Sequence, residues 1–170
     1  QFLTYLRDVR QLSPHTLSNY GRDLAALLDW CRQQNIGSAA EVSTGDIRQY
    51  ASQLHRKGLA GSSIQRNLSA IRSFYSHLSR QRKDNIHHNP ANGIQAPNQA
   101  RRLPKTLDVD QLGRFLQTQS NDPLELRDLA MAELFYSSGL RLSELASLNL
   151  DDINPGTALV TVIGKGSKAR

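Results

Sequence analysis

The sequence has little of what marks several protein classes. Its 170 residues include one cysteine, Cys31, so a disulfide framework is excluded and a reducing compartment, the cytoplasm, is expected. No apolar run approaches the roughly 20 residues that a membrane-spanning helix needs, and the mean hydropathy is −0.50. We therefore expect neither a disulfide-rich secreted domain nor membrane insertion.

Patterns that bind metals or nucleotides are also scarce. His87 and His88 are neighbours, but no second pair follows at ligand spacing. Residues 164–167 (GKGS) are not a phosphate-binding P-loop, because that motif needs an earlier glycine where Leu159 stands and because a strand-like run precedes them. We therefore expect no metal and no other cofactor.

Charge, in contrast, is plentiful and uneven. Residues 1–105 carry fifteen lysines and arginines against six acidic residues, a net charge of +9, whereas residues 106–170 carry six against nine. The isoelectric point is about 9.8. A front half this basic favours nucleic acid as the partner. The alternative is a basic surface that serves only solubility.

Four helical patterns precede residue 84. The first is short, over residues 2–10, and the second opens with Ser13 as N-cap and proline at its first helical position. A capping start at residues 43–46 predicts a third helix, and residues 62–63 open a fourth. In the fourth helix apolar residues recur at three- and four-residue steps, and its arginines lie off that stripe. These patterns predict a helical domain over residues 1–84.

Residues 85–105 interrupt the helical periodicity. Asn, Pro and Gly punctuate this stretch, and its end is basic, with Arg101, Arg102 and Lys105. Such composition predicts an interdomain linker, whose basic end can follow a DNA backbone.

Residues 106–170 predict the leading part of a mixed α+β domain. Asp108 and Asp122 are N-caps of two helices, the second ending near Gly139, and a short helix follows from Ser143. The β-branched run at 158–163, a turn at 164–166 and a return strand from 167 predict a β-hairpin. The whole chain is thus expected to be mainly α.

Arg141 and Glu144 are the first candidate site. An arginine at the start of a helix faces a partial positive charge, which suits a residue that binds an anion there. The guanidinium fork matches phosphate oxygens, and a carboxylate three residues on can hold it from behind. The alternative is an ordinary surface ion pair worth about 0.3–0.5 kcal/mol.

Lys165 is the second candidate, between two glycines on the predicted turn. There it can reach a DNA groove and act as a general acid, or it is an ordinary solvated turn lysine. His77 and Arg80 match a His-x-x-Arg box by letters, but they lie on the basic fourth helix and are interpreted as helix surface, with Arg80 as a DNA contact. The five tyrosines mostly lie on apolar stripes and are expected in the core. They are Tyr5, Tyr20, Tyr50, Tyr75 and Tyr136.

Taken together, ordered motifs along nearly the whole chain resemble the tyrosine recombinase (phage integrase) family. Within it the chain is most similar to the bacterial Xer recombinases, closer to the XerC type than to XerD. The matching stretches are residues 12–17, 68–74, 89–91, 103–105, 126–128, 139–145 and 164–168.

The resemblance implies a SAM-like four-helix core-binding domain whose second and fourth helices face DNA major grooves, followed by the start of the catalytic domain. Arg141 would clamp the scissile phosphate, Glu144 would support it, and Lys165 would protonate the 5′-hydroxyl leaving group. The DNA-binding candidates are Arg22, Arg66, Arg72, Arg80, Arg101 and Arg102.

The resemblance also implies a metal-free reaction through a 3′-phosphotyrosyl intermediate, in a tetrameric synapse of related protomers on duplex DNA. The reaction would resolve chromosome or plasmid dimers at cell division. The nucleophilic tyrosine belongs beyond Arg170 in the family order, so residues 1–170 by themselves are expected to bind DNA without a covalent link.

Three alternatives stay open at this point. The first is a phage or integron integrase with the same chemistry. The second is a non-enzymatic helical DNA-binding regulator, which would have no need of a turn lysine after an arginine-headed helix. The third is an RNA-binding helical module, which preference for duplex DNA would separate.

Overall fold

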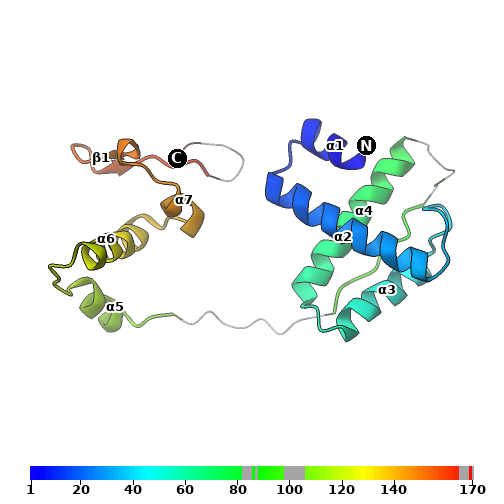
Figure 1. Ribbon diagram of the computed structural model, residues 1–170, viewed down its shortest axis with the longest axis horizontal. Coiled ribbons are helices and arrows are strands. Elements are labelled where there is room, and N and C mark those ends of the chain that lie inside the picture. The colour runs from blue at the N-terminus through cyan, green and yellow to red at the C-terminus, as the bar shows by residue number, and fades with distance from the viewer. Residues whose placement is uncertain (82–85, 87, 98–105, 165–168, 170) are drawn as a thin grey trace. The chain divides into compact units, whose positions relative to one another are not determined.

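The computed structural model describes residues 1–81, 86, 88–97, 106–164 and 169. It divides into two compact units, Gln1–Arg102 and Leu103–Arg170. The described chain is mainly helical with a small antiparallel sheet, which confirms the predicted fold class (Figure 1). No described helix is both long and apolar enough to cross a membrane.

The four predicted helices of the N-terminal unit are all present. They are α1 (Phe2–Asp8), α2 (Pro14–Gln33), α3 (Thr44–Arg56) and α4 (Gly61–Arg80). Ser13 caps α2 by accepting a hydrogen bond from the Thr16 backbone N–H. Ser43 and Asp46 form a reciprocal capping box at α3, and these hydrogen bonds from Ser43 lower the pKa of Asp46. The local capping signals were therefore sufficient to predict these two starts.

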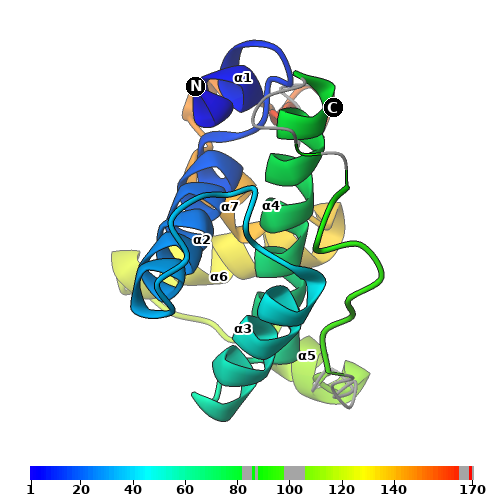
Figure 2. The same cartoon turned by 90° about the vertical axis from the view of Figure 1, so that its right-hand side faces the viewer.

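Helix α4 is the centre of this unit. It packs against α2 and α3 (Figure 2), and Ile64, Leu68 and Ile71 on its apolar stripe are almost fully buried. The Tyr75 hydroxyl donates to the Ala39 carbonyl at 3.0 Å and so ties α4 to the loop between α2 and α3. Cys31 is buried in the same core.

Helix α1 packs across the C-terminal end of α4 through aromatic rings. The Phe2 and Phe74 ring centroids lie 5.5 Å apart in an edge-on arrangement. The Tyr5 ring lies 4.4 Å from the His77 ring, and His77 is buried. His77 therefore belongs to the packing of α1 on α4 and not to the helix surface on which the sequence placed it, because two aromatic rings cover it.

Part of the stretch predicted as a linker contributes to the core. Ile86, Ala91 and Ile94 are buried in the same cluster as the stripe of α4. Pro90 is fully buried as well. The described part of residues 86–97 therefore packs on the N-terminal unit.

The second unit holds α5 (Val109–Leu116), α6 (Pro123–Ser138) and α7 (Leu142–Ala146), then a 3₁₀ turn at Leu150–Asp152. Asp108 and Asp122 cap α5 and α6 as predicted. Helix α6 ends at Gly139, whose φ of +60° is the left-handed conformation that glycine adopts at little cost. Among the described residues of this unit only Glu144 and Val162 are buried.

The sheet pairs differently from the prediction. Strand β2 covers only Leu159–Val160. It pairs antiparallel with β1, Ile153–Asn154, which precedes it in the chain. Of the expected hairpin to the following segment, the described residues show one antiparallel bridge, Ile163 to Ala169. The sequence analysis did not predict β1 as the partner of β2. A turn joins the two strands, and in it the Asn154 side chain accepts hydrogen bonds from the N–H groups of Gly156 and Thr157.

The tyrosines follow the prediction with one exception. Tyr50 and Tyr75 are buried, and Tyr5 and Tyr20 are half-buried. Tyr136 is 65% exposed on α6. Its assignment to the core was wrong, because α6 has no clear apolar stripe that would decide which face is covered.

Burial in the α4 core gives a direct stability prediction. Leu68 is 1% exposed, whereas Leu28 on α2 is 56% exposed. Leu68→Ala should lower the free energy of unfolding by about 2–5 kcal/mol through lost burial and a cavity, whereas Leu28→Ala should change it by less than about 0.5 kcal/mol. Urea unfolding followed by the fluorescence of Trp30, the single tryptophan, measures both. Equal losses would contradict this core.

Candidate functional site

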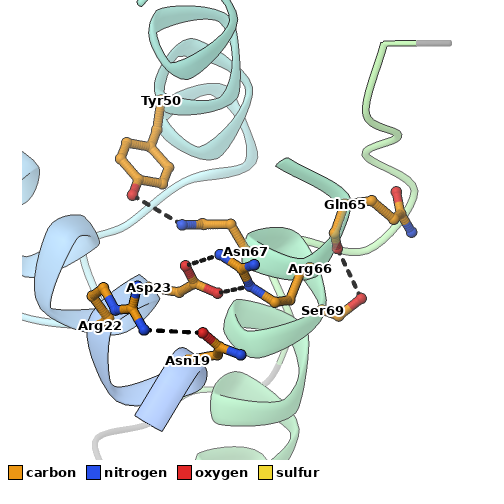
Figure 3. Close-up of polar contacts among 8 residues, drawn as sticks. All are labelled: Asn19, Arg22, Asp23, Tyr50, Gln65, Arg66, Asn67 and Ser69. Carbon is orange, nitrogen blue, oxygen red and sulfur yellow. Dashed lines mark hydrogen bonds and ion pairs between the residues drawn. The ribbon is translucent and has the colours of Figure 1, made fainter. Parts of the chain in front are cut away.

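A polar seam runs where α2 and α4 meet (Figure 3). It consists of Asn19, Arg22 and Asp23 on α2 and Arg66 on α4. At its centre Arg66 donates from Nε to Asp23 Oδ2 at 2.9 Å and from Nη2 to Asp23 Oδ1 at 3.1 Å. The hydrogen bond that Arg66 donates to this carboxylate raises the pKa of Arg66. The seam therefore holds one guanidinium in a fixed bidentate geometry.

A second arginine, Arg22, lies beside this pair, and its Nη2 donates to Asn19 Oδ1 at 3.1 Å. On the flank of α4 turned away from α2, the Ser69 hydroxyl donates to the Gln65 carbonyl at 2.9 Å (Figure 3). Arg22 and Gln65 are exposed. Behind the seam, buried Asn67 donates from Nδ2 to the Tyr50 hydroxyl at 3.4 Å. The seam is thus a surface of hydrogen-bonding side chains over a packed interior.

Arg72 points to a different environment from the other candidate arginines of α4. Its Nε donates to the Ala91 carbonyl at 3.3 Å and its Nη2 to the Ile94 carbonyl at 3.1 Å. Asn89 returns a hydrogen bond from Nδ2 to the Arg72 carbonyl at 2.8 Å. Arg72 therefore fastens the following segment to α4, whereas Arg80 is exposed at the last position of the helix.

Arg141 and Glu144 meet as the sequence predicted. Glu144 Oε1 accepts from Arg141 Nη1 at 2.7 Å, and Oε2 accepts from the Arg141 backbone N–H at 2.7 Å. The Glu144 carboxylate thus caps α7 and also holds the side chain of Arg141, the N-cap residue of that helix. The Arg141 side chain is 59% exposed and that of Glu144 is 4% exposed. The guanidinium keeps donors that face solvent while its partner is buried.

Burial of the carboxylate distinguishes two ion pairs from the others in the described chain. In Arg7–Asp8, Arg32–Asp29 and Arg127–Asp128 both side chains are more than half exposed. In Arg66–Asp23 and Arg141–Glu144 the carboxylate side chains are only 8% and 4% exposed. Exposed pairs are screened and contribute little, so these two are the pairs that fix a geometry.

Sequence reasoning missed Asp23. A signal was present, because Asp23 lies on the apolar stripe of α2, three residues after Tyr20 and four before the buried Leu27. An acid on a core stripe needs a partner. The partner, Arg66, is 43 residues away in sequence, so its identity could not be predicted from spacing.

Three candidates lie outside the described residues. They are Lys165, Arg101 and Arg102. Within the described part of the chain there is no cluster of three or more His, Cys, Asp or Glu side chains that could hold a metal ion.

Two family models match the chain. Residues 1–82 match "Phage integrase, N-terminal SAM-like domain" and residues 105–170 match "Phage integrase family". Only residues 83–104 fall between the two matches. The first match includes the seam, and the second includes the Arg141–Glu144 pair.

Similarity to individual proteins also runs along the chain. Tyrosine recombinase XerC of Pseudomonas fluorescens is 48% identical over 170 residues, which is 99% of this chain and 56% of that protein. XerC of Xanthomonas campestris pv. campestris (strain B100) is 45% identical over 169 residues, which is 99% of this chain and 52% of that protein. The chain thus spans about half the length of the curated relatives it matches.

The fold of this chain is also similar to that of a solved structure. XerH site-specific recombinase, bound to a palindromic difH substrate in a post-cleavage complex, matches with a TM-score of 0.68 at 18% identity, covering 95% of this chain and 49% of that one. At this identity the match speaks for the fold alone. With both family models and the relatives in agreement, the chain belongs to the phage integrase family of tyrosine recombinases, as one of the Xer type.

Proposed function

We propose that this chain provides the DNA-binding part and the leading catalytic part of a XerC-type site-specific DNA recombinase. The observation that carries the proposal is the identity of 45–48% to XerC recombinases over 99% of the chain. The complete enzyme would act in the cytoplasm, where it would resolve chromosome or plasmid dimers at cell division. Its partners would be duplex DNA and related protomers in a tetrameric synapse.

In this proposal residues 1–84 bind DNA, residues 85–105 connect, and residues 106–170 begin the catalytic domain. The first 105 residues carry the net charge of +9, which suits a polyanion. The proposed DNA contacts are Arg22, Arg66 and Arg80 in the helices and Arg101 and Arg102 in the connection. Arg72 is already engaged by two backbone carbonyls, so we assign it to positioning the connection.

The proposed catalytic roles follow the charge that develops on a phosphate during strand cleavage. A tyrosine from beyond residue 170 gives up its phenolic proton to solvent and attacks the phosphorus, the bond to the 5′-oxygen breaks, and Lys165 supplies the proton to that oxygen. Arg141 stabilises the negative charge on the non-bridging oxygens. Glu144 holds Arg141 through two hydrogen bonds of 2.7 Å, so the guanidinium needs little reorganisation when the charge forms.

Salt dependence tests the DNA-binding role. Residues 1–170 should bind duplex DNA with an affinity that falls steeply with salt, by a slope of about 0.9 per phosphate contacted. Arg22→Ala and Arg80→Ala should each lower affinity and reduce the slope by about 1. Arg114→Ala is the matched control, because Arg114 lies on α5 in the acidic half. Fluorescence anisotropy over a salt series measures these effects, and equal losses for all three variants would contradict the assignment.

Strand cleavage tests the role of Arg141. In the complete recombinase, Arg141→Ala should lower the cleavage rate on the order of 10²–10³-fold, the usual effect of removing one transition-state donor, with DNA affinity nearly unchanged. Glu144→Gln should give a smaller loss, because it keeps the shape but weakens the hold on the guanidinium. Single-turnover cleavage of a nicked duplex is the measurement, with Arg114→Ala as control. Normal cleavage by Arg141→Ala would refute the role.

A further inference from the structure

The Arg66–Asp23 pair leaves one edge of the guanidinium available. A guanidinium carries five N–H donors, and Asp23 takes one from Nε and one from Nη2. The remaining three lie on Nη1 and on the outer side of Nη2. This terminal edge has the spacing that bidentate acceptors require, and the Arg66 side chain is 41% exposed.

The pair also holds Arg66 still. The Asp23 side chain is 8% exposed, so it sits on the packed side of α2 and cannot follow a mobile arginine into solvent. A side chain that is ordered before binding loses less conformational entropy when it binds. Arg66 is therefore prepared for a contact that depends on direction.

Charge argues against a phosphate as the target of that contact. Non-specific affinity for DNA comes from cations that neutralise phosphates, and the pair as a whole carries no net charge. Its neighbours on the seam are Asn19, which is uncharged and half-buried, and the exposed Arg22, whose Nη2 donates to Asn19. Arg, Asn and Gln with fixed direction are the side chains that read base edges in a major groove.

We propose that Arg66 is a base-reading residue that takes two acceptors on one base edge, with guanine O6 and N7 as the fitting pair, and that Asp23 is its positioning residue. The proposal rests on the proposed DNA binding by the N-terminal unit. It adds that the seam supplies sequence preference, while Arg22, Arg80 and the basic connection supply affinity.

A purely structural tie between α2 and α4 would have a different consequence. Removing such a tie would lower stability and leave the order of preferred DNA sequences unchanged. Removing a positioning residue changes that order, even though Asp23→Asn makes the protein more positive and so favours DNA in general. Two measurements therefore separate a structural tie from a base-reading role. They are the direction in which non-specific affinity changes and the change in the order of preferred DNA sequences.

The experiment uses residues 1–170 and a library of duplexes with a randomised central segment. The wild-type chain selects its preferred duplex, and affinity for that duplex is compared with affinity for unselected genomic DNA at one salt concentration. The variants are Asp23→Asn, Arg66→Lys and the matched control Asp29→Asn. Asp29 is on the same helix, loses the same charge, and forms an exposed ion pair with Arg32.

The discrimination ratio should fall about tenfold for Asp23→Asn and for Arg66→Lys, within the range of one lost bidentate base contact. The loss should map to one base pair in repeated selections. Non-specific affinity should stay equal or rise for Asp23→Asn. Asp29→Asn should keep the wild-type preference.

Each other result is decisive. Unchanged preference in Arg66→Lys, or a wild-type chain that binds duplex DNA without any preference, overturns the inference and leaves the proposed function standing. A wild-type chain with no salt-dependent duplex binding refutes the proposed function itself. Circular dichroism checks that each variant folds; if Asp23→Asn does not, Arg66→Lys decides alone, because its half-exposed side chain keeps the charge and loses the fork.

Discussion

The burial of one side of α4 is the constraint on which the N-terminal unit depends. Ile64, Leu68 and Ile71 are almost fully buried between neighbouring helices. Because a helix repeats every 3.6 residues, committing these positions to the core turns Arg66 towards Asp23 of α2 and the surface. The periodicity that builds the core thus also builds the seam, and a shift of the stripe by one residue would lose both.

The two units use the same solution for orienting an arginine. In each, a carboxylate that is nearly removed from water holds a guanidinium that is not. Hydrogen bonds to a buried acceptor are stronger than those in water, so the carboxylate sets the direction of the arginine while solvent or a ligand meets its free edge. Asp23 reaches its arginine across two helices, and Glu144 does so within one turn while also capping α7. The long-range pair therefore needs the tertiary fold, and the local one does not.

This difference explains how much the sequence could predict. Ser13, Ser43, Asp108 and Asp122 act over three residues or fewer, so the sequence alone predicts each of them as a cap. Arg141 and Glu144 were paired for the same reason. The Asp23–Arg66 pair, the packing of Ala91 and Ile94 and the pairing of β1 with β2 depend on how distant segments meet. Local patterns do not carry that information. The role of Lys165 and the domain boundaries stay predictions.

The fastening of residues 89–94 to α4 bears on where the N-terminal unit ends as a self-sufficient piece of chain. A fragment cut at residue 84 would strip the Ala91 and Ile94 carbonyls from Arg72 and leave its half-buried donors without acceptors. It would also remove the fully buried Pro90 and expose the core residues that residues 89–94 cover. A fragment that keeps these contacts therefore has to include residues 89–94, and one cut before them would expose apolar surface that invites aggregation.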